Sequence, residues 1–235
     1  MRMTNVYLTF DIDWAPEEVI KYTLDKLTKS NLKATFFATH ESNILKSLNT
    51  EFFEVGIHPN FNISKGDLLT PIEDLMKIYP NACGGRSHSL FSSSNILEVY
   101  ERFGLKYESN IFLPYHKNLN MVKRRKNLFS IPFFWSDDYC LDNNLLNKKK
   151  INKLLYTEGL KVFNFHPIHI FVNTPSFDFY NKVKKYYKDP KKLIEIKNNS
   201  QYGIEDVFNE IVNQITNINV NTNKMEMILK YESDS

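Results

Sequence analysis

Short apolar runs alternate with segments of helical period along most of the chain, and this alternation restricts the possible folds more than any other feature. Runs such as 6–10 and 34–39 are rich in β-branched and aromatic residues, which is typical of buried strands. Segment 17–29 instead repeats its apolar residues at helical spacing. Further strands are expected at 53–57, 82–87, 105–109, 128–134 and 160–165, and further helices at 44–48, 71–79, 95–103 and 151–156. The sequence therefore predicts an α/β fold, a single distorted barrel of the (β/α)7 type.

The C-terminal quarter of the chain follows this alternation less closely. Residues 170–200 are rich in Tyr and Lys, and we expect a lid or insertion there. Segment 204–218 has the pattern of an amphipathic helix that packs back on the barrel, and 225–231 is expected to add a last strand. The 235 residues fit one catalytic domain spanning 1–235.

The composition excludes several classes of partner. A net charge of +3 is too balanced to indicate binding to nucleic acid or to a membrane surface. No apolar run approaches the roughly 20 residues that span a bilayer. Asp11 interrupts the N-terminal region before the apolar core of a signal peptide could form, so we expect a cytoplasmic protein. Cys83 and Cys140 lack the spacing of a cysteine metal site, and we interpret them as free thiols.

Ionisable side chains fall repeatedly at the C-terminal ends of the predicted strands. In a parallel barrel this end is the catalytic face, because the loops that follow the strands converge there. The residues concerned are Asp11, Asp13, His40, His58, His88 and His166. Four histidines at this face are hard to explain as scattered core residues.

Asp11 and Asp13 are two residues apart, and on an extended strand both side chains would lie on one face. One carboxylate could then bind a metal while the other accepts a proton from the attacking water. A competing interpretation is that Asp13 only caps the following helix. Arg86 and His88 have the same two-residue spacing, which would let Arg86 orient a carboxylate from the same strand face.

The remaining candidates are His58, in Gly56-Ile57-His58-Pro59, and the pair His166 and His169. Because His166 and His169 cannot share one strand face, we favour His166 for the site and leave His169 between the site and its surroundings.

In this order and spacing the motifs resemble the polysaccharide deacetylase (NodB-homology) family, over roughly residues 4–170. Thr9-Phe10-Asp11-Ile12-Asp13 resembles the opening motif of that family. The resemblance implies that Asp11 is the general base, that Asp13 and His58 bind a divalent metal, expected to be Zn²⁺, and that His166 is the general acid. Arg86 stands where the family has the arginine that orients the base.

The same resemblance suggests where an acetylated sugar, sugar nucleotide or glycan would bind. Trp135 with Asp137 or Asp138 resembles the aromatic and acidic fourth motif, and a core tryptophan is the competing interpretation of Trp135. We therefore expect the substrate to be bound by Trp135, Asp138, His169 and Asn60.

Two departures from the family pattern affect the metal site. Asn62 stands at the position of the second metal histidine, so the third ligand is expected to be His88, with Asn62 or His40 as alternatives. Ile12 separates the two aspartates. Together with Gly-Ile-His-Pro-Asn-Phe and Arg-Ser-His-Ser, this pattern is most similar to the WbmS-like subgroup associated with surface-polysaccharide loci.

The expected activity is metal-dependent hydrolysis of an acetyl or similar acyl group on a sugar in surface-polysaccharide metabolism. Two alternatives remain open at this point: a metal- or carbohydrate-binding pseudoenzyme on the same barrel, and a hydrolase of another non-peptide amide bond.

Overall fold

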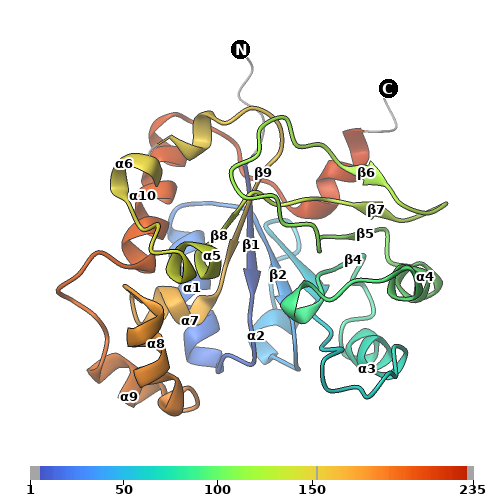
Figure 1. Cartoon of the computed structure of the whole chain (residues 1–235), viewed down its shortest axis with the longest axis horizontal. Coiled ribbons are helices and arrows are strands. Elements are labelled where there is room, and N and C mark those ends of the chain that lie inside the picture. The colour runs from blue at the N-terminus through green and yellow to red at the C-terminus, as the bar shows by residue number, and fades with distance from the viewer. Residues whose placement is uncertain (1–5, 152, 232–235) are drawn as a thin grey trace.

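A nine-stranded sheet with helices around it forms the body of the protein (Figure 1). The computed structural model describes residues 6–151 and 153–231. The strands are β1 Val6–Asp11, β2 Ala34–Ala38, β3 Phe53–Ile57, β4 Gly84–Gly85, β5 Tyr107–Glu108, β6 Val122–Lys123, β7 Phe129–Ser130, β8 Trp135–Ser136 and β9 Lys161–Phe165. All neighbouring strands pair in parallel except β6 and β7, which are antiparallel.

The strand order β6-β7-β5-β4-β3-β2-β1-β9-β8 describes a sheet that curls back on itself. β7 and β8 belong to one stretch, 129–136, whose beginning pairs with β5 and whose end pairs with β9. Between them, the N–H of Phe133 donates to the carbonyl of Ile111 at 3.0 Å. This stretch therefore joins the two sides of the curled sheet, and the predicted distorted β/α barrel is confirmed.

Strand alternation separates two cores. In β1, Val6, Leu8 and Phe10 point outward to the helices, whereas Tyr7 points into the barrel with an apolar cluster. That inner cluster consists of Tyr7, Phe37, Tyr107, Ile131, Phe133, Val162, Met225 and Ile228. It fills the barrel towards the N-terminal ends of the strands, so the polar inward residues gather at the opposite end.

The helices are α1 Glu17–Lys29, α2 Asn43–Lys46, α3 Thr70–Ile78, α4 Ser94–Arg102, α5 Asp137–Asp142, α6 Lys148–Ile151, α7 Pro167–Phe171, α8 Phe177–Val183, α9 Pro190–Glu195 and α10 Ile204–Asn217, with 3-10 helices η1 His88–Leu90, η2 Leu154–Tyr156, η3 Lys184–Tyr186 and η4 Met225–Tyr231. The longer helices, such as α1 and α10, cover the outside of this sheet, whereas η1 and η4 lie at its two ends (Figure 1). In the described part of the chain, no helix is both long enough and apolar enough to cross a bilayer.

The strand expected at 225–231 is wrong, because this segment forms the 3-10 helix η4. Met225 and Ile228 are three residues apart, so one turn of 3-10 helix places both side chains in the inner cluster. The N–H of Met225 also donates to the hydroxyl of Thr35 at 2.9 Å, which fixes η4 across the N-terminal end of the barrel.

Residues 170–200, expected as a lid, contain the short helices α8, η3 and α9. Val183 and Leu193 are buried, and they attach this segment to the main core. Tyr187 reaches from here to the end of β1, where its hydroxyl donates to the carbonyl of Asp13 at 2.5 Å. The segment thus lies against the site, and its role as a lid stays a prediction.

Candidate metal and catalytic site

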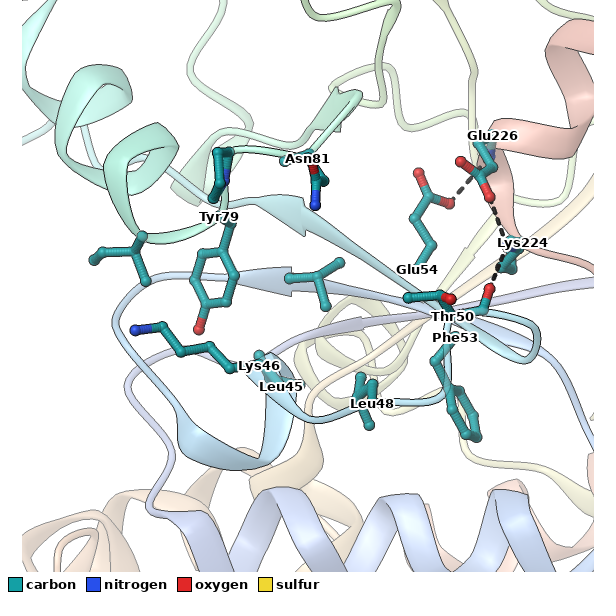
Figure 2. Close-up of a pocket in the computed structure, with 14 residues that line it drawn as sticks. Leu45, Lys46, Leu48, Thr50, Phe53, Glu54, Tyr79, Asn81, Lys224 and Glu226 are labelled. Carbon is teal, nitrogen blue, oxygen red and sulfur yellow. Dashed lines mark hydrogen bonds and ion pairs between the residues drawn. The ribbon is translucent and has the colours of Figure 1, made fainter.

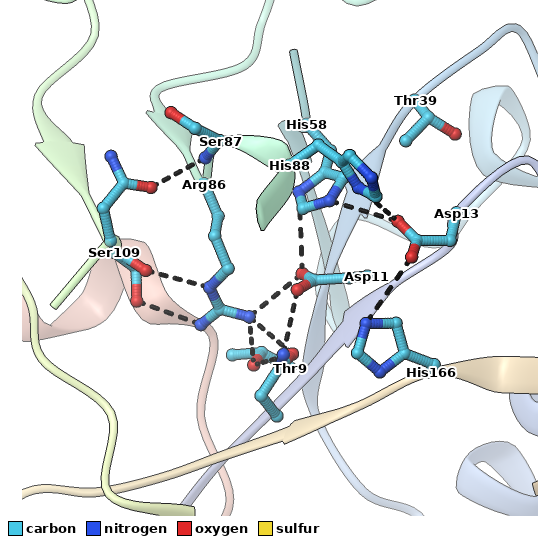
Figure 3. Close-up of polar contacts among 12 residues, drawn as sticks. Thr9, Asp11, Asp13, Thr39, His58, Arg86, Ser87, His88, Ser109 and His166 are labelled. Carbon is cyan, nitrogen blue, oxygen red and sulfur yellow. Dashed lines mark hydrogen bonds and ion pairs between the residues drawn. The ribbon is translucent and has the colours of Figure 1, made fainter. Parts of the chain in front are cut away.

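Asp11 lies at the centre of a buried polar network at the C-terminal end of the barrel (Figure 3). It is the last residue of β1 and points inward. Its Oδ1 accepts a hydrogen bond from Arg86 Nη1 at 3.0 Å, and its Oδ2 accepts one from the side-chain amide of Asn164 at 2.9 Å. Two donors, one directly after β4 and one in β9, therefore fix the orientation of this carboxylate.

Arg86 is fully buried, and its guanidinium is enclosed on all sides. It lies 4.5 Å from the ring centroids of both Phe37 and Phe133. Its Nε donates to the carbonyl of Ser109 at 3.0 Å, and its Nη2 donates to the hydroxyl of the same residue at 2.9 Å. This enclosed cation forms a buried ion pair with the carboxylate of Asp11 at 3.0 Å.

Asp13 approaches Asp11 through a turn, which corrects the expected extended-strand geometry. Ile12 points outward into the core and continues the pairing with β2, since its N–H donates to the carbonyl of Phe37 at 3.2 Å. The chain then turns back with φ of 41° at Asp13 and 57° at Trp14, a left-handed conformation that is costly for residues other than glycine. The extra residue between the aspartates is accommodated by this turn.

Two histidines contact the same oxygen of Asp13 (Figure 3). His58 Nε2 and His88 Nδ1 each lie 3.2 Å from Asp13 Oδ1. Burial opposes ionisation of Asp13, but hydrogen bonds from His58 and His88 and the charge of His166 outweigh it and hold the pKa of Asp13 well below its usual value. The hydrogen bond with Asp13 in turn raises the pKa of His88.

Neighbouring strands position these histidines. His58 directly follows β3, and its N–H donates to the carbonyl of Ala38 at 2.7 Å. Two residues earlier, a Cβ on Gly56 would lie 2.7 Å from the Phe37 ring, so only glycine fits between that ring and the strand. β4 ends at Gly85, and His88 begins η1; the expected common strand for Arg86 and His88 is therefore shorter than predicted, although both side chains reach the site.

His166 faces Asp13 from the opposite side of the cavity. Its N–H donates to Asp137 Oδ2 at 2.6 Å, and its Nδ1 lies 2.8 Å from Asp137 Oδ1. Its Nε2 lies 3.7 Å from Asp13 Oδ2. Burial alone would lower the pKa of His166, but the charges of Asp138 and Asp137 outweigh it and raise this pKa well above the usual value.

Asp138 and His169 form a pair next to His166. His169 Nε2 lies 2.9 Å from Asp138 Oδ1, and Asp138 Oδ2 lies 3.7 Å from His166 Nε2. Partial burial opposes ionisation of Asp138, but the charge of His166 and the hydrogen bond from His169 lower its pKa to about 2.

These side chains line a cavity of about 300 Å³. Its polar lining includes Asp11, Asp13, His58, His88, Asn164 and His166. Its apolar lining includes Leu90, Phe112, Phe133 and Tyr139. A cavity of this kind, with convergent polar groups and apolar side chains, is typical of a small-molecule or substrate site.

Residues 8–184 match the profile of the family described as "WbmS-like: Polysaccharide deacetylase". The chain belongs to this family. It is therefore a hydrolase of the deacetylase type, which acts on carbon–nitrogen bonds other than peptide bonds. The matched range contains every candidate site residue named above.

Solved structures of related proteins share the fold. The WbmS protein of Bordetella bronchiseptica, a proposed polysaccharide deacetylase involved in O-antigen biosynthesis, is 29% identical, with a TM-score of 0.81 over 89% of this chain and 90% of that one. The peptidoglycan deacetylase PdaC of Bacillus subtilis is 15% identical, with a TM-score of 0.55 over 99% of this chain and 93% of that one.

A 4-α-glucanotransferase of Thermococcus litoralis is 14% identical, with a TM-score of 0.55 over 97% of this chain and 40% of that one. No curated protein matches the chain. Because the glucanotransferase shares the barrel, the fold alone does not define the chemistry, and the side chains of the site carry the functional argument.

Some residues expected at the site of this deacetylase lie elsewhere. Asn62 is exposed, and its amide donates to the hydroxyl of Ser89 at 3.1 Å. His40 contacts Thr39 through Nδ1 at 3.0 Å and belongs to neither histidine group described above. Asn60 accepts a hydrogen bond from the N–H of Asn62 and does not line the cavity.

Trp135 is 1% exposed and packs against Phe163 and Phe165, so it offers no ring face to a sugar. The pairing of β8 with β9 turns Trp135 outward to the core and turns Ser136 inward to the cavity. The structure thus matches the competing interpretation of Trp135 as a core residue.

Sequence reasoning gave no role to Asn164 and did not separate Asp137 from Asp138. The strand period would have identified Asn164, because it lies two residues before His166 and therefore faces inward. Asp137 is distinguished from Asp138 only by its contacts with His166. Nothing in the local sequence predicts the contact of Tyr187 with Asp13.

A second cavity of about 360 Å³ lies beside β3, between α2 and the end of α3, and reaches Glu54 and Glu226 (Figure 2). Burial raises the pKa of Glu54. Its oxygens already accept hydrogen bonds from the hydroxyls of Tyr107 and Thr35 and from the N–H of Glu226. The carboxylate of Glu54 therefore anchors η4 to the barrel. These three hydrogen bonds occupy most of the acceptor positions of its two oxygens.

Proposed function

We propose that this protein is a metal-dependent hydrolase that removes an acetyl or similar acyl group from a sugar in surface-polysaccharide metabolism. The observation that carries the proposal is the convergence of Asp13, His58 and His88 between an oriented carboxylate, Asp11, and an imidazole, His166, in one cavity. The relative involved in O-antigen biosynthesis supports the cellular context.

We assign Asp13, His58 and His88 as the ligands of a divalent cation, with Zn²⁺ as the preferred ion. One carboxylate and two imidazoles are a common donor set for catalytic zinc. The buried Nδ1 of His58 has no hydrogen-bond partner among the described residues, and Asp11 Oδ1 lies 3.9 Å from it. A proton on Nδ1 leaves the Nε2 lone pair for the metal. When bound, such a cation polarises the acyl carbonyl and lowers the pKa of the attacking water.

The other residues of the site have distinct roles. Asp11 accepts the proton of the attacking water, and Arg86 with Asn164 keeps its carboxylate in position. His166 donates a proton to the departing nitrogen through Nε2, since Asp137 holds its Nδ1. The apolar lining with Phe112 and Tyr139 provides the contact surface for the acyl group and the sugar ring. Asp138 and His169 remain candidates for substrate contacts.

The direct test is a deacetylation assay on N- and O-acetylated sugars, sugar nucleotides and glycans, with the bound metal quantified in the same protein. Release of acetate that is lost with a chelator and restored by Zn²⁺ supports the proposal. A protein that binds metal but deacetylates no compound of a broad panel would instead be the pseudoenzyme considered above.

The ligand assignment predicts which variants lose the metal. Asp13→Ala, His58→Ala and His88→Ala should each lose bound Zn²⁺ while keeping the fold, because the barrel core does not depend on these side chains. Asn62→Ala is the matched control and should keep the metal, since its amide is exposed and bonded to Ser89. Metal analysis and circular dichroism of the four proteins provide the measurement. Full occupancy in His88→Ala with loss in Asn62→Ala would reverse the assignment of the third ligand.

The assignment of His166 as the proton donor predicts how activity depends on pH at the alkaline side of the pH–rate profile. The charges of Asp138 and Asp137 raise the pKa of His166, so its protonated form persists to higher pH than in a free imidazole. Activity should therefore fall only as pH rises through this raised value. Asp137→Asn removes one of the two charges, and the alkaline limb of kcat should move to lower pH. An unchanged limb would exclude His166 as the group that titrates there.

A further inference from the structure

A second group of potential metal ligands lies beside the first. We propose that Asp138, His166 and His169 bind a second divalent cation, and that this cation inhibits the enzyme. The facing atoms of these three side chains all lie within 4.8 Å of one another. The inference rests on the proposed function, because inhibition requires that His166 serve as the proton donor.

Helix α7 and the start of α5 bring the three groups together. His166 immediately precedes α7 and His169 lies one turn later, a spacing that places both rings on one side of the helix. Their ring centroids are 5.7 Å apart. Asp138, in the first turn of α5, directs one oxygen to each ring: Oδ1 lies 2.9 Å from His169 Nε2 and Oδ2 lies 3.7 Å from His166 Nε2.

Both imidazoles are oriented through their other ring nitrogen. Asp137 contacts His166 Nδ1 at 2.8 Å, and the hydroxyl of Thr174 contacts His169 Nδ1 at 3.0 Å. A carboxylate or hydroxyl oxygen that accepts the Nδ1 proton leaves the Nε2 lone pair to a metal, which is the usual arrangement of metal-binding histidines. In each ring, Nε2 is the atom that faces Asp138.

Asp13 connects the two groups. Its Oδ1 contacts His58 and His88, and its Oδ2 faces His166 Nε2 at 3.7 Å. One carboxylate thus has an oxygen for each cation, as in two-metal sites. Three carboxylates, those of Asp13, Asp137 and Asp138, surround His166, and a second cation would offset their charge.

The second cation would bind more weakly than the first and would act as an inhibitor. It must displace the existing contact between His169 and Asp138, and it shares Asp13 with the first cation. It would also occupy His166 Nε2, the atom that has to protonate the leaving nitrogen. The same nitrogen cannot bind a metal and carry a proton, so filling this site removes the general acid.

The experiment is a calorimetric titration of metal-free protein with Zn²⁺. Acetate release is measured at each zinc concentration. The titration uses the Cys83→Ser background, because Glu54, Cys83 and Glu226 form a third group that could bind zinc. We expect two equivalents, with activity rising as the first binds and falling as the second binds.

His169→Phe keeps an aromatic ring next to Tyr180, which lies 4.6 Å from the His169 ring, but it removes a ligand. This variant should bind the first equivalent and need at least about tenfold more Zn²⁺ for the second, the usual effect of disturbing a metal shell. Asp138→Asn should weaken binding of the second equivalent in the same way. Because the Asp138 side chain is half-exposed, this variant can replace His169→Phe if the latter does not fold. His40→Gln is the control and should bind both equivalents.

The outcomes separate the two proposals. A single equivalent in the Cys83→Ser protein without further changes would overturn the second site and leave the proposed function intact. A second equivalent that binds with unchanged affinity in both His169→Phe and Asp138→Asn would also overturn it. Absence of even the first equivalent would contradict the proposed function itself.

Discussion

Replacing Asp11 by Asn is expected to lower kcat by about 10²–10⁴-fold, the usual contribution of general-base assistance. Asn keeps the shape of the side chain and an oxygen for Arg86, but it cannot accept the proton of the attacking water. Asp11 does not belong to the group formed by Asp13, His58 and His88, so bound metal should be retained. The measurement is kcat on the best substrate of the panel, with metal content and circular dichroism determined for the same sample.

Asp142→Asn is the matched control for this change. Asp142 ends α5 and is exposed, so its substitution should leave kcat unchanged. Near-normal turnover in a metal-loaded Asp11→Asn protein would show that another group accepts the proton, and the assignment of Asp11 as the base would be abandoned.

Replacing Arg86 by Met should have the largest effect on stability. Met fits between the rings of Phe37 and Phe133, but the carboxylate of Asp11 then stays buried without its cation. Removing one partner of a buried ion pair typically lowers the free energy of unfolding by about 3–5 kcal/mol. Urea denaturation of the metal-free proteins measures this loss without a contribution from bound zinc.

A double variant tests the cause of that loss. In Arg86→Met with Asp11→Asn no buried charge remains unpaired, so the double variant should be more stable than Arg86→Met alone. Arg102→Met, at an exposed position in α4, should change the free energy of unfolding by no more than about 0.5 kcal/mol. If the double variant is less stable than Arg86→Met, loss of packing and not an unpaired charge explains the effect.

Sequence periodicity predicted the fold well where elements are long. The expected helix 17–29 and strand 53–57 agree with α1 and β3 residue for residue. The expected strands 82–87 and 105–109 are reduced to two paired residues each, because hydrogen-bond register with neighbours, and not local composition, decides where pairing ends. The error at 225–231 has the same origin, since contacts with distant strands select the 3-10 helix.

The site was partly accessible from the sequence. Residues at strand ends, such as Asp11 and His58, could be predicted because inward side chains alternate along a strand and the loops after the strands converge at one end of the barrel. The positions of Asp13 and His88 depend on turns with positive φ at Asp13, Trp14 and Ser89. Such a turn cannot be predicted from the sequence where the residue is not glycine, because positive φ is uncommon for other residue types. The contact of Tyr187 with Asp13 joins segments far apart in the chain and left no local pattern.

The pairing of β1 with β9 has a consequence for protein synthesis. The hydroxyl of Thr9 donates to the carbonyl of Phe163, 154 residues further along the chain. A ribosome releases β1 early and β9 only after most of the chain has been made. Until then, the edge of β1 that pairs with β9 has no hydrogen-bond partner strand. Asp11 lacks Asn164 during that time. In a nascent chain, the carboxylate of Asp11, the proposed base, therefore gains its hydrogen bond from Asn164 only when translation has passed β9.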